Sequence, residues 1–320
     1  MTAQLLYGLV VDSEVPLHQD RPAPDGAPVD VRIRWGAPRT PAETRRLPDG
    51  RVLLRARWAR RTHYTFVERA DGTYLLRFHG ACDVEVSAGL DDVVVHTLTG
   101  ADPGLAGVLT TGATLAFLLI RAGKTVLHAS AVDLGGIALA FAAPSGGGKS
   151  TMATLLCADG GRVVTDDVLR VDEDLTVRLG ATGLRLRKGA DSLVDLFADA
   201  SPGRRTSADD RQVLTPLTAT TDHLPLAAIV VPYPDRRLRR VRTERRAGKD
   251  ALVDLLSFPR LLGWEAPEIL AAQLGQLGRL VAAVPVYRAR VPWGPPFSPT
   301  LAAELRDQVP ELRQSVTPGR

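Results

Sequence analysis

The sequence predicts an α/β protein, α+β overall, with a β-rich N-terminal domain and a second domain in which strands and helices alternate. Short strand-like runs fill residues 1–104. A stretch with helical periodicity follows at 105–122, and strand-like and helix-like runs then alternate. These observations predict a first domain at 1–104, a second at 105–310 and a loose tail at 311–320.

The N-terminal domain is predicted to be an antiparallel sheet. The run VRIRW at 31–35 alternates apolar and basic side chains, as a half-exposed strand does. Asp71 and Gly72 separate two later runs and form a typical hairpin turn signal. The predicted strands span 5–11, 31–35, 51–58, 63–69, 73–80, 82–88 and 92–98.

The second domain is predicted to open with a buried helix, because leucines recur at helical spacing within 105–122. The polar segment 201–212 is rich in helix and strand breakers, so we expect a mobile loop there. Strands are expected at 125–129, 137–141, 162–164, 168–171, 175–179, 183–187, 226–231 and 286–291. Helices are expected at 150–158, 191–198, 250–256 and 267–284.

Composition indicates a globular protein and excludes several functional classes. The 320 residues are 45% hydrophobic and 24% charged, close to globular averages. The formal net charge of +4 is mild, so we expect neither a nucleic-acid nor a membrane partner. Cys82 and Cys157 cannot form a disulfide framework, and the N-terminus lacks signal-peptide features. The apolar stretch 115–120 is too short to span a bilayer, so we expect a cytoplasmic protein.

A glycine-rich segment carries the sharpest functional signal. Residues 143–150 fit the phosphate-loop pattern A-x-x-x-x-G-K-S, with an apolar strand before it and a helix after it. Glycines let the backbone wrap around phosphate, the lysine reaches the outer phosphates, and the serine hydroxyl suits Mg²⁺. The alternative, a glycine-rich turn that happens to precede a helix, does not require Lys-Ser-Thr. The predicted phosphate-binding residues are Ser145, Gly146, Gly147, Gly148, Lys149, Ser150 and Thr151.

An acid pair follows one helix and one strand later. Asp166 and Asp167 come directly after the predicted strand 162–164, at the end of a strand where α/β proteins bind ligands. Adjacent carboxylates beside a metal-bound nucleotide can divide two roles, one near the metal and one handling the acceptor proton. A lone Asp-Asp pair is usually a solvated turn, but this placement favours function.

Two further candidates carry weaker signals. His128 lies on the strand before the loop strand, where a core histidine and a site histidine are equally expected. Arg211 belongs to a polar segment together with Arg204 and Arg205. A solvated loop is the simple interpretation of these arginines, and closure of one arginine over a transferring phosphate is the functional one.

Three motifs in order carry a family resemblance. LHASAV at 127–132, APSGGGKST at 143–151 and TDDVL at 165–169 resemble the HPr kinase/phosphorylase superfamily, whose nucleotide core also occurs in ATP-dependent phosphoenolpyruvate carboxykinases. The chain is most similar to the HPr-kinase-like serine kinases found beside genes for ribosomally made peptides, lasso peptides among them. Weaker flanking similarity lies in YGLVVDSEVPL, GLRLRKGADSLVDLF, LPLAAIVV and VPVYRARVP.

The resemblance implies a P-loop core, ATP and Mg²⁺, and roles for individual residues. Asp166 corresponds to the acid that acts on the acceptor hydroxyl, and Asp167 to its neighbour near the metal beside Ser150. His128 corresponds to the histidine near the phosphates, and Arg211 aligns with a basic loop residue. Since the HPr enzymes are hexamers, the resemblance also makes a homo-oligomer a candidate assembly.

Two departures narrow the expected activity. The segment GATGLRLRKG at 180–189 lacks the carboxylate of the family's E-x-R-G segment, which lies near the metal. The C-terminal G-R-N segment, associated with dephosphorylation, is also missing, which argues against phosphorylase activity and against HPr as substrate.

The leading hypothesis is therefore an ATP- and Mg²⁺-dependent kinase acting on a hydroxyl, foremost a serine of a peptide or small protein. The N-terminal domain would then serve acceptor recognition or assembly. A nucleotide-binding regulatory module with little or no hydrolysis, and a kinase of a small metabolite such as a sugar, stay open as alternatives.

Overall fold

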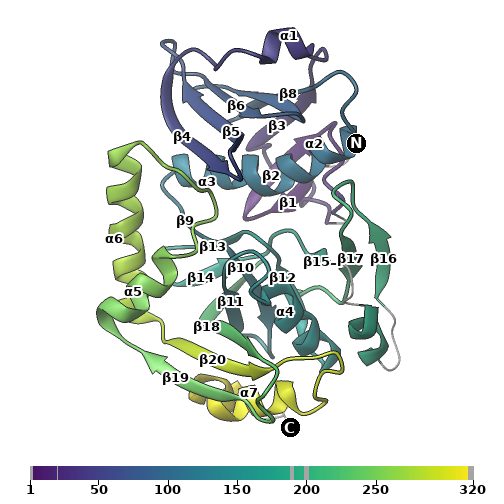
Figure 1. The fold of residues 1–320 in the computed structure, drawn as a ribbon, viewed down its shortest axis with the longest axis vertical. Helices are drawn as coiled ribbons and strands as arrows, with labels where there is room; N and C mark the ends of the chain where they lie inside the picture. The colour runs from purple at the N-terminus through teal and green to yellow at the C-terminus, as the bar shows by residue number, and fades with distance from the viewer. Residues whose placement is uncertain (1–2, 20, 188–190, 198–201, 316–320) are drawn as a thin grey trace. The chain divides into compact units, whose positions relative to one another are not determined.

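The computed structural model describes residues 3–19, 21–187, 191–197 and 202–315 (Figure 1). The chain divides into two compact units. Unit 1 comprises Met1–Lys124, Ser207–Asp209 and Arg260–Gln273, and unit 2 comprises Thr125–Thr206, Asp210–Pro259 and Leu274–Arg320. The helical segment predicted at 105–122 therefore groups with the N-terminal strands, although the sequence placed it in the second domain.

Unit 1 contains an eight-stranded sheet in the order β1-β2-β3-β8-β7-β6-β5-β4. The predicted strands are confirmed, except that the run 5–11 forms two strands around a turn at Tyr7 and Gly8, which both have positive φ. The expectation of a wholly antiparallel sheet is wrong, because β3 pairs in parallel with β2 and with β8. The strands are β1 (Gln4–Leu6), β2 (Leu9–Ser13), β3 (Val31–Trp35), β4 (Arg51–Trp58), β5 (Arg61–Glu68), β6 (Tyr74–Phe78), β7 (Cys82–Val86) and β8 (Asp92–Thr97), with the short helix α1 (Pro41–Thr44).

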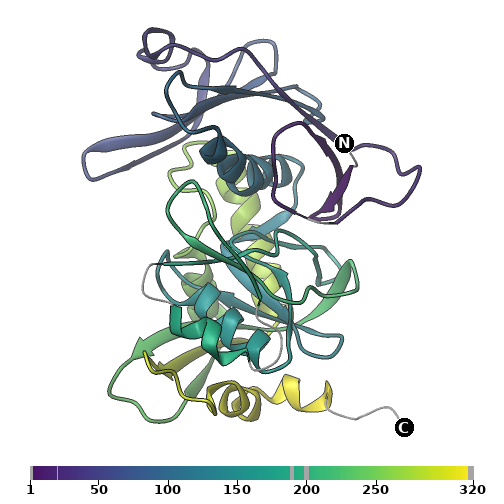
Figure 2. The same ribbon diagram turned by 90° about the vertical axis from the view of Figure 1, so that its right-hand side faces the viewer.

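The predicted helix of unit 1 is confirmed as α2 (Pro103–Leu109), a π-helical turn η1 (Thr110–Thr114) and α3 (Leu115–Arg121), which follow one another without a gap. This segment lies across one face of the sheet (Figure 2), where the Phe117 ring packs edge-on to Phe66 at 5.5 Å between centroids. By length and mean hydropathy, 1.7, the segment could cross a membrane. However, 61% of that window is buried, as in the core helix of a soluble protein.

Unit 2 contains a nine-stranded mixed sheet. Its main path runs β12-β10-β11-β18-β14-β13-β9, and β20 joins β18 to β19. Only the pairs of β18 with β11 and β20 are parallel, so the unit is α+β rather than a regular alternation of parallel strands and helices. The strands are β9 (Thr125–Leu127), β10 (Ala129–Asp133), β11 (Ala138–Ala142), β12 (Arg162–Thr165), β13 (Leu169–Val171), β14 (Thr176–Arg178), β18 (His223–Asp235), β19 (Arg242–Arg246) and β20 (Val286–Pro292).

Helices cover both faces of this sheet. Because side chains alternate along β11, Leu139 and Phe141 pack in the cluster that contains Met152 of α4, whereas Ala138 and Ala140 belong to the opposite cluster. The opposite cluster includes apolar residues of α5 and α6. The helices are α4 (Lys149–Ala158), α5 (Gly248–Leu256), α6 (Pro267–Ala283), which belongs to unit 2 from Leu274 on, and α7 (Leu301–Gln308), with the 3₁₀ turns η2 (Asp191–Leu196) and η3 (Pro310–Ser315).

Several sequence-based expectations for unit 2 need correction. The segment 201–212 is not a loop throughout, because β16 (Gly203–Thr206) pairs with β17 (Gln212–Thr215), which also pairs with β15 (Leu184–Leu186). Strand β19 and helix α7 were not predicted, since charged residues dominate the first and both are short. The predicted loose tail begins as η3 with Leu312 buried, and residues 316–320 lie outside the described part.

Candidate active site

The strand order gathers the predicted site residues at one edge of the unit 2 sheet. Strand β10 lies between β11 and β12 and is antiparallel to both. The carboxyl ends of β11 and β12 therefore meet the start of β10 at the same edge. These three strand ends carry the glycine-rich loop, the acid pair and the residues around His128.

The loop between β11 and α4 adopts a conformation that requires glycine. Gly146 and Gly148 have φ of +83° and +96°, which L side chains rarely adopt. A Cβ at Gly147 would lie 2.7 Å from the Cβ of Ala143, and one at Gly148 would lie 2.6 Å from the Trp293 ring. Gly148 is the N-cap of α4 and provides no side-chain cap, so the first turn, with Thr151 half-buried, presents its N–H groups to the loop.

Lys149 is the buried cation of the loop. Its side chain belongs to a residue only 7% exposed, and Nζ donates to the carbonyl oxygens of Ala143 at 2.9 Å and Pro144 at 3.3 Å. A buried ammonium needs such partners, because desolvation is costly. These carbonyls are neutral, so an anion entering the loop would be a stronger partner for Nζ.

Asp166 is held by three donors. The residue is 3% exposed, and its carboxylate accepts hydrogen bonds from Ser130 Oγ at 2.5 Å, Ser150 Oγ at 2.8 Å and the backbone N–H of Arg185 at 2.8 Å. The carboxylate thus joins the loop serine to the end of β12. Ser130 was not predicted as a site residue. Its position two residues after His128, on the strand next to the glycine-rich loop, could have indicated it.

Asp167 faces a different partner. His128 Nε2 lies 2.9 Å from Asp167 Oδ1, and the Asp167 side chain is 39% exposed. Asp167 also has φ of +72°, a left-handed conformation that aspartate tolerates better than most residues and that is concentrated at functional sites. The acid pair therefore splits: Asp166 is buried against Ser150, and Asp167 is half-exposed against His128.

Arg187 is a site residue that the sequence analysis missed. Its Nη2 donates to Ser145 Oγ at 3.3 Å, and its Cζ lies 2.8 Å from where a Gly146 Cβ would be. The exposed guanidinium thus lies over the glycine-rich loop. The last registered pair between β15 and β17 is Leu186 with Gln212, so the next positions, Arg187 and Arg211, lie across from each other.

The oxygen donors of this edge match the chemistry of Mg²⁺. Mg²⁺ binds through hydroxyl and carboxylate oxygens and typically takes one or two carboxylates together with phosphate oxygens. Ser150 and Asp166 provide such a hydroxyl and carboxylate within 3 Å of each other. Within the described residues, no group of three or more His, Cys, Asp or Glu side chains is arranged to hold a metal.

Comparisons with known proteins give a sparse result. No protein-family model matches the chain, and no curated protein matches it. Among solved structures, the HPr(Ser) kinase/phosphatase from Coxiella burnetii is similar at 12% identity and a TM-score of 0.30. That match covers 60% of this chain and 97% of the other. At these values the likeness assigns neither a family nor an activity, so the geometry of the site must support any proposal.

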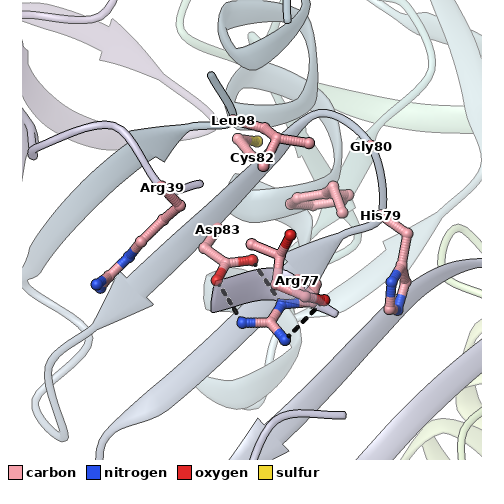
Figure 3. A pocket seen from close by; sticks show the side chains of 9 residues that line it. Arg39, Arg77, His79, Gly80, Cys82, Asp83 and Leu98 are labelled. Carbon is pink, nitrogen blue, oxygen red and sulfur yellow. Dashed lines mark hydrogen bonds and ion pairs between the residues drawn. The ribbon is translucent and has the colours of Figure 1, made fainter. Parts of the chain in front are cut away.

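Unit 1 contains a small polar pocket of a different character (Figure 3). Its volume of about 50 Å³ is large enough for a few water molecules but too small for a typical ligand, since ligand pockets measure several hundred Å³. Burial and the neighbouring Asp83 raise the pKa of Cys82, which lines it, to about 12, so this thiol stays protonated. The remaining lining residues are Arg39, Thr44, Arg77, Phe78, His79, Gly80 and Leu98.

The ion pair in this pocket is structural. Arg77 donates to both carboxylate oxygens of Asp83 at 2.8 and 2.6 Å (Figure 3). Its remaining nitrogen donates to the carbonyl oxygens of Arg46 and Thr44. The two side chains are 7% and 3% exposed. Every polar atom of the pair thus has a partner, and the pair fixes the segment after α1 to the sheet.

We expect Asp83→Asn to destabilise the protein by about 3–5 kcal/mol, because it leaves the buried Arg77 without a counter-charge. Asp92→Asn is the matched control, since its pair with Arg34 is roughly half exposed on both sides and worth about 1 kcal/mol at most. Urea unfolding followed by tryptophan fluorescence measures both. Equal losses in the two variants would contradict a structural role for the buried pair.

Proposed function

We propose that this chain is an ATP- and Mg²⁺-dependent kinase that transfers the γ-phosphate to a hydroxyl group, foremost a serine of a peptide or small protein. The carrying observation is that one sheet edge combines a glycine-rich loop with Lys149, a carboxylate bonded to Ser150, and a second carboxylate held by His128. Each part matches one requirement of phosphoryl transfer, namely phosphate binding, metal binding and orientation of the attacking hydroxyl.

The phosphate-binding side uses the loop and Asp166. Lys149 exchanges the carbonyls of Ala143 and Pro144 for the outer phosphates, while the glycine backbone and the start of α4 receive the remaining charge. Ser150 and Asp166 would hold Mg²⁺, which would supply positive charge against the phosphates of the bound nucleotide. Ser130 and the Arg185 N–H keep the Asp166 carboxylate in place.

The acceptor side uses Asp167 and His128. The oxygen of the acceptor hydroxyl attacks the γ-phosphorus, and the bond from that phosphorus to ADP breaks. Asp167 takes the proton that the hydroxyl loses. His128 orients the Asp167 carboxylate through the 2.9 Å contact. This division reverses the one expected from the resemblance, because Asp166 is buried and fully engaged whereas Asp167 is accessible.

Arginines supply the remaining positive charge. Arg187, over the loop at Ser145, neutralises charge that develops on the transferred group, and Arg211 lies across from it. We expect Arg187→Gln to lower kcat by about 10²-fold with little change in thermal stability, because its side chain is exposed. Steady-state kinetics beside Arg61→Gln, an exposed arginine of unit 1, test this. An unchanged kcat in Arg187→Gln would remove this residue from the mechanism.

The wider setting of the proposal follows from the composition. Both cysteines are buried free thiols, which suits a reducing compartment, and we propose a cytoplasmic location. The strand-rich unit 1 would serve acceptor recognition or assembly, including a homo-oligomer. With a peptide acceptor, the proposal includes neither a nucleic-acid nor a membrane partner.

One observation supports a second candidate function. Segment 180–189 carries no acid, so the carboxylate expected there from the family resemblance is missing, and the segment contributes arginines at 185 and 187 instead. A nucleotide-binding regulatory module that hydrolyses ATP slowly or not at all would not need that further carboxylate. A kinase of a small metabolite is the third alternative.

The deciding experiment incubates the protein with γ-labelled ATP, Mg²⁺ and serine-containing peptides encoded beside its gene, with a set of sugars in parallel. We expect label on peptide serine, identified by phosphoamino-acid analysis and absent with Asp167→Asn. Label on a sugar instead would support the metabolite kinase. ATP binding without label on any hydroxyl acceptor would leave the regulatory module and refute the kinase.

A further inference from the structure

A cluster of exposed arginines surrounds the turn from β18 to β19. We name as the arginine turn the six exposed residues Arg236, Arg237, Arg239, Arg240, Arg242 and Arg245. The net charge of the whole chain is only +4, so this short segment is far more basic than the rest. Within the part of the chain that the structure describes, no acidic side chain forms an ion pair with any of the six.

Neighbouring arginines are paired and serve the fold. Arg288 of β20 is paired with Asp254 of α5, and Arg246 contacts Asp254 at 3.3 Å and Glu244 at 2.9 Å. Asp250 of α5 lies 3.4 Å from Arg246. The acids near this edge are therefore engaged by the inner arginines, and the outer ones face solvent.

Strand register aligns charges across the sheet. Arg290 of β20 lies opposite both Tyr233 of β18 and Arg242 of β19, so the three side chains form one row on one face. Arg290 pairs with Asp235 at 2.7 Å, but Arg242 lies directly opposite another arginine. Like charges in directly opposite positions are destabilising, and an anion bound between them would relieve that cost.

The backbone N–H groups along the outer edge of β19 are not available to pair with an added strand. Figure 1 shows β19 beside β20 at the margin of the sheet. Glu304 and Gln308 of α7 accept the N–H groups of Val241 and Thr243 at 2.8 and 2.9 Å. An added strand would have to break these bonds, so a ligand must bind through side chains.

We propose that the arginine turn docks an acidic peptide segment. Arginine, unlike lysine, offers a planar fork that binds carboxylates with two parallel hydrogen bonds, and the segment from 232 to 246 contains arginine without lysine. Single-stranded nucleic acid would need aromatic stacking platforms. Tyr233, the exposed aromatic of this face, already has the Arg288 guanidinium 5.5 Å from its ring centroid.

Fluorescence anisotropy tests the proposal on the full chain without ATP or Mg²⁺. The probes are a labelled peptide of alternating glutamate and glycine, its glutamine counterpart, and a labelled single-stranded oligonucleotide. We expect the glutamate peptide to bind best, with affinity falling as salt rises. The triple variant Arg239→Gln/Arg240→Gln/Arg242→Gln should lose at least about tenfold in affinity, or about 1.4 kcal/mol.

The matched control is Arg57→Gln/Arg60→Gln/Arg61→Gln, which removes the same charge from an exposed turn of unit 1 and should stay within about twofold of wild type. Equal losses in both triple variants would reduce the effect to net charge and overturn the proposal. So would equal binding of the glutamate and glutamine peptides by the wild type, or tighter binding of the oligonucleotide. Lys149→Met should bind the glutamate peptide as wild type does. Failure of peptide docking and failure of the kinase proposal can therefore be distinguished.

Discussion

Replacing Lys149 with methionine is expected to lower phosphoryl transfer by at least about 10³-fold and to weaken ATP binding strongly. Nζ is the cation at the centre of the loop and the group that must exchange two carbonyls for phosphate. Methionine keeps much of the side-chain volume and removes the charge. Labelled-ATP transfer and equilibrium binding of a fluorescent ATP analogue measure the two losses.

Lys249→Met provides the control, because Lys249 is an exposed residue in the first turn of α5. It should leave transfer and ATP binding unchanged. Thermal melting must show that Lys149→Met still folds, since the carbonyls of Ala143 and Pro144 lose a donor. Retained ATP binding in a folded Lys149→Met protein would contradict the assignment of the loop to phosphate.

Asp167→Asn is expected to lower transfer by about 10²–10⁴-fold while leaving ATP affinity within about twofold. The amide cannot accept the proton of the attacking hydroxyl, but it can still contact His128. The Asp167 side chain contacts His128 and is partly exposed. Single-turnover transfer and nucleotide binding, measured on the same preparation, separate the two effects.

Asp166→Asn should behave differently, because Asp166 is bonded to Ser150. We expect it to raise the Mg²⁺ concentration needed for half-maximal transfer, a change that Asp167→Asn should not show. If Asp167→Asn shifted the Mg²⁺ requirement and Asp166→Asn did not, the two acids would have the roles that the family resemblance implies.

Much of this site could be predicted because its signals are local. The glycine-rich loop, Lys149 and Ser150 stand together in the sequence, and strand and helix flank them as predicted. The positions of the short strands in the first unit could also be predicted from alternation and turn residues, but their parallel pairing could not. The two acids were identified as a pair for the same reason.

The remainder depends on contacts between distant segments. Ser130 and the Arg185 N–H meet at Asp166 only because β10 inserts between β11 and β12, which no local pattern encodes. Arg187 lies over Ser145 through the pairing of β15 with β17, and β16 and β17 come partly from a segment predicted as loop. The arginine turn was hidden by the mild net charge, because acids elsewhere in the chain cancel it.

His128 occupies a single-residue break between two strands with different partners. Strand β9 pairs with β13, and β10 pairs with β11 and β12, so the backbone is tied on both sides of the ring. The strand pairing therefore fixes the backbone position from which the imidazole reaches Asp167. The sheet therefore fixes the partner of Asp167, so the loops around this acid can vary in sequence while its contact with His128 is kept.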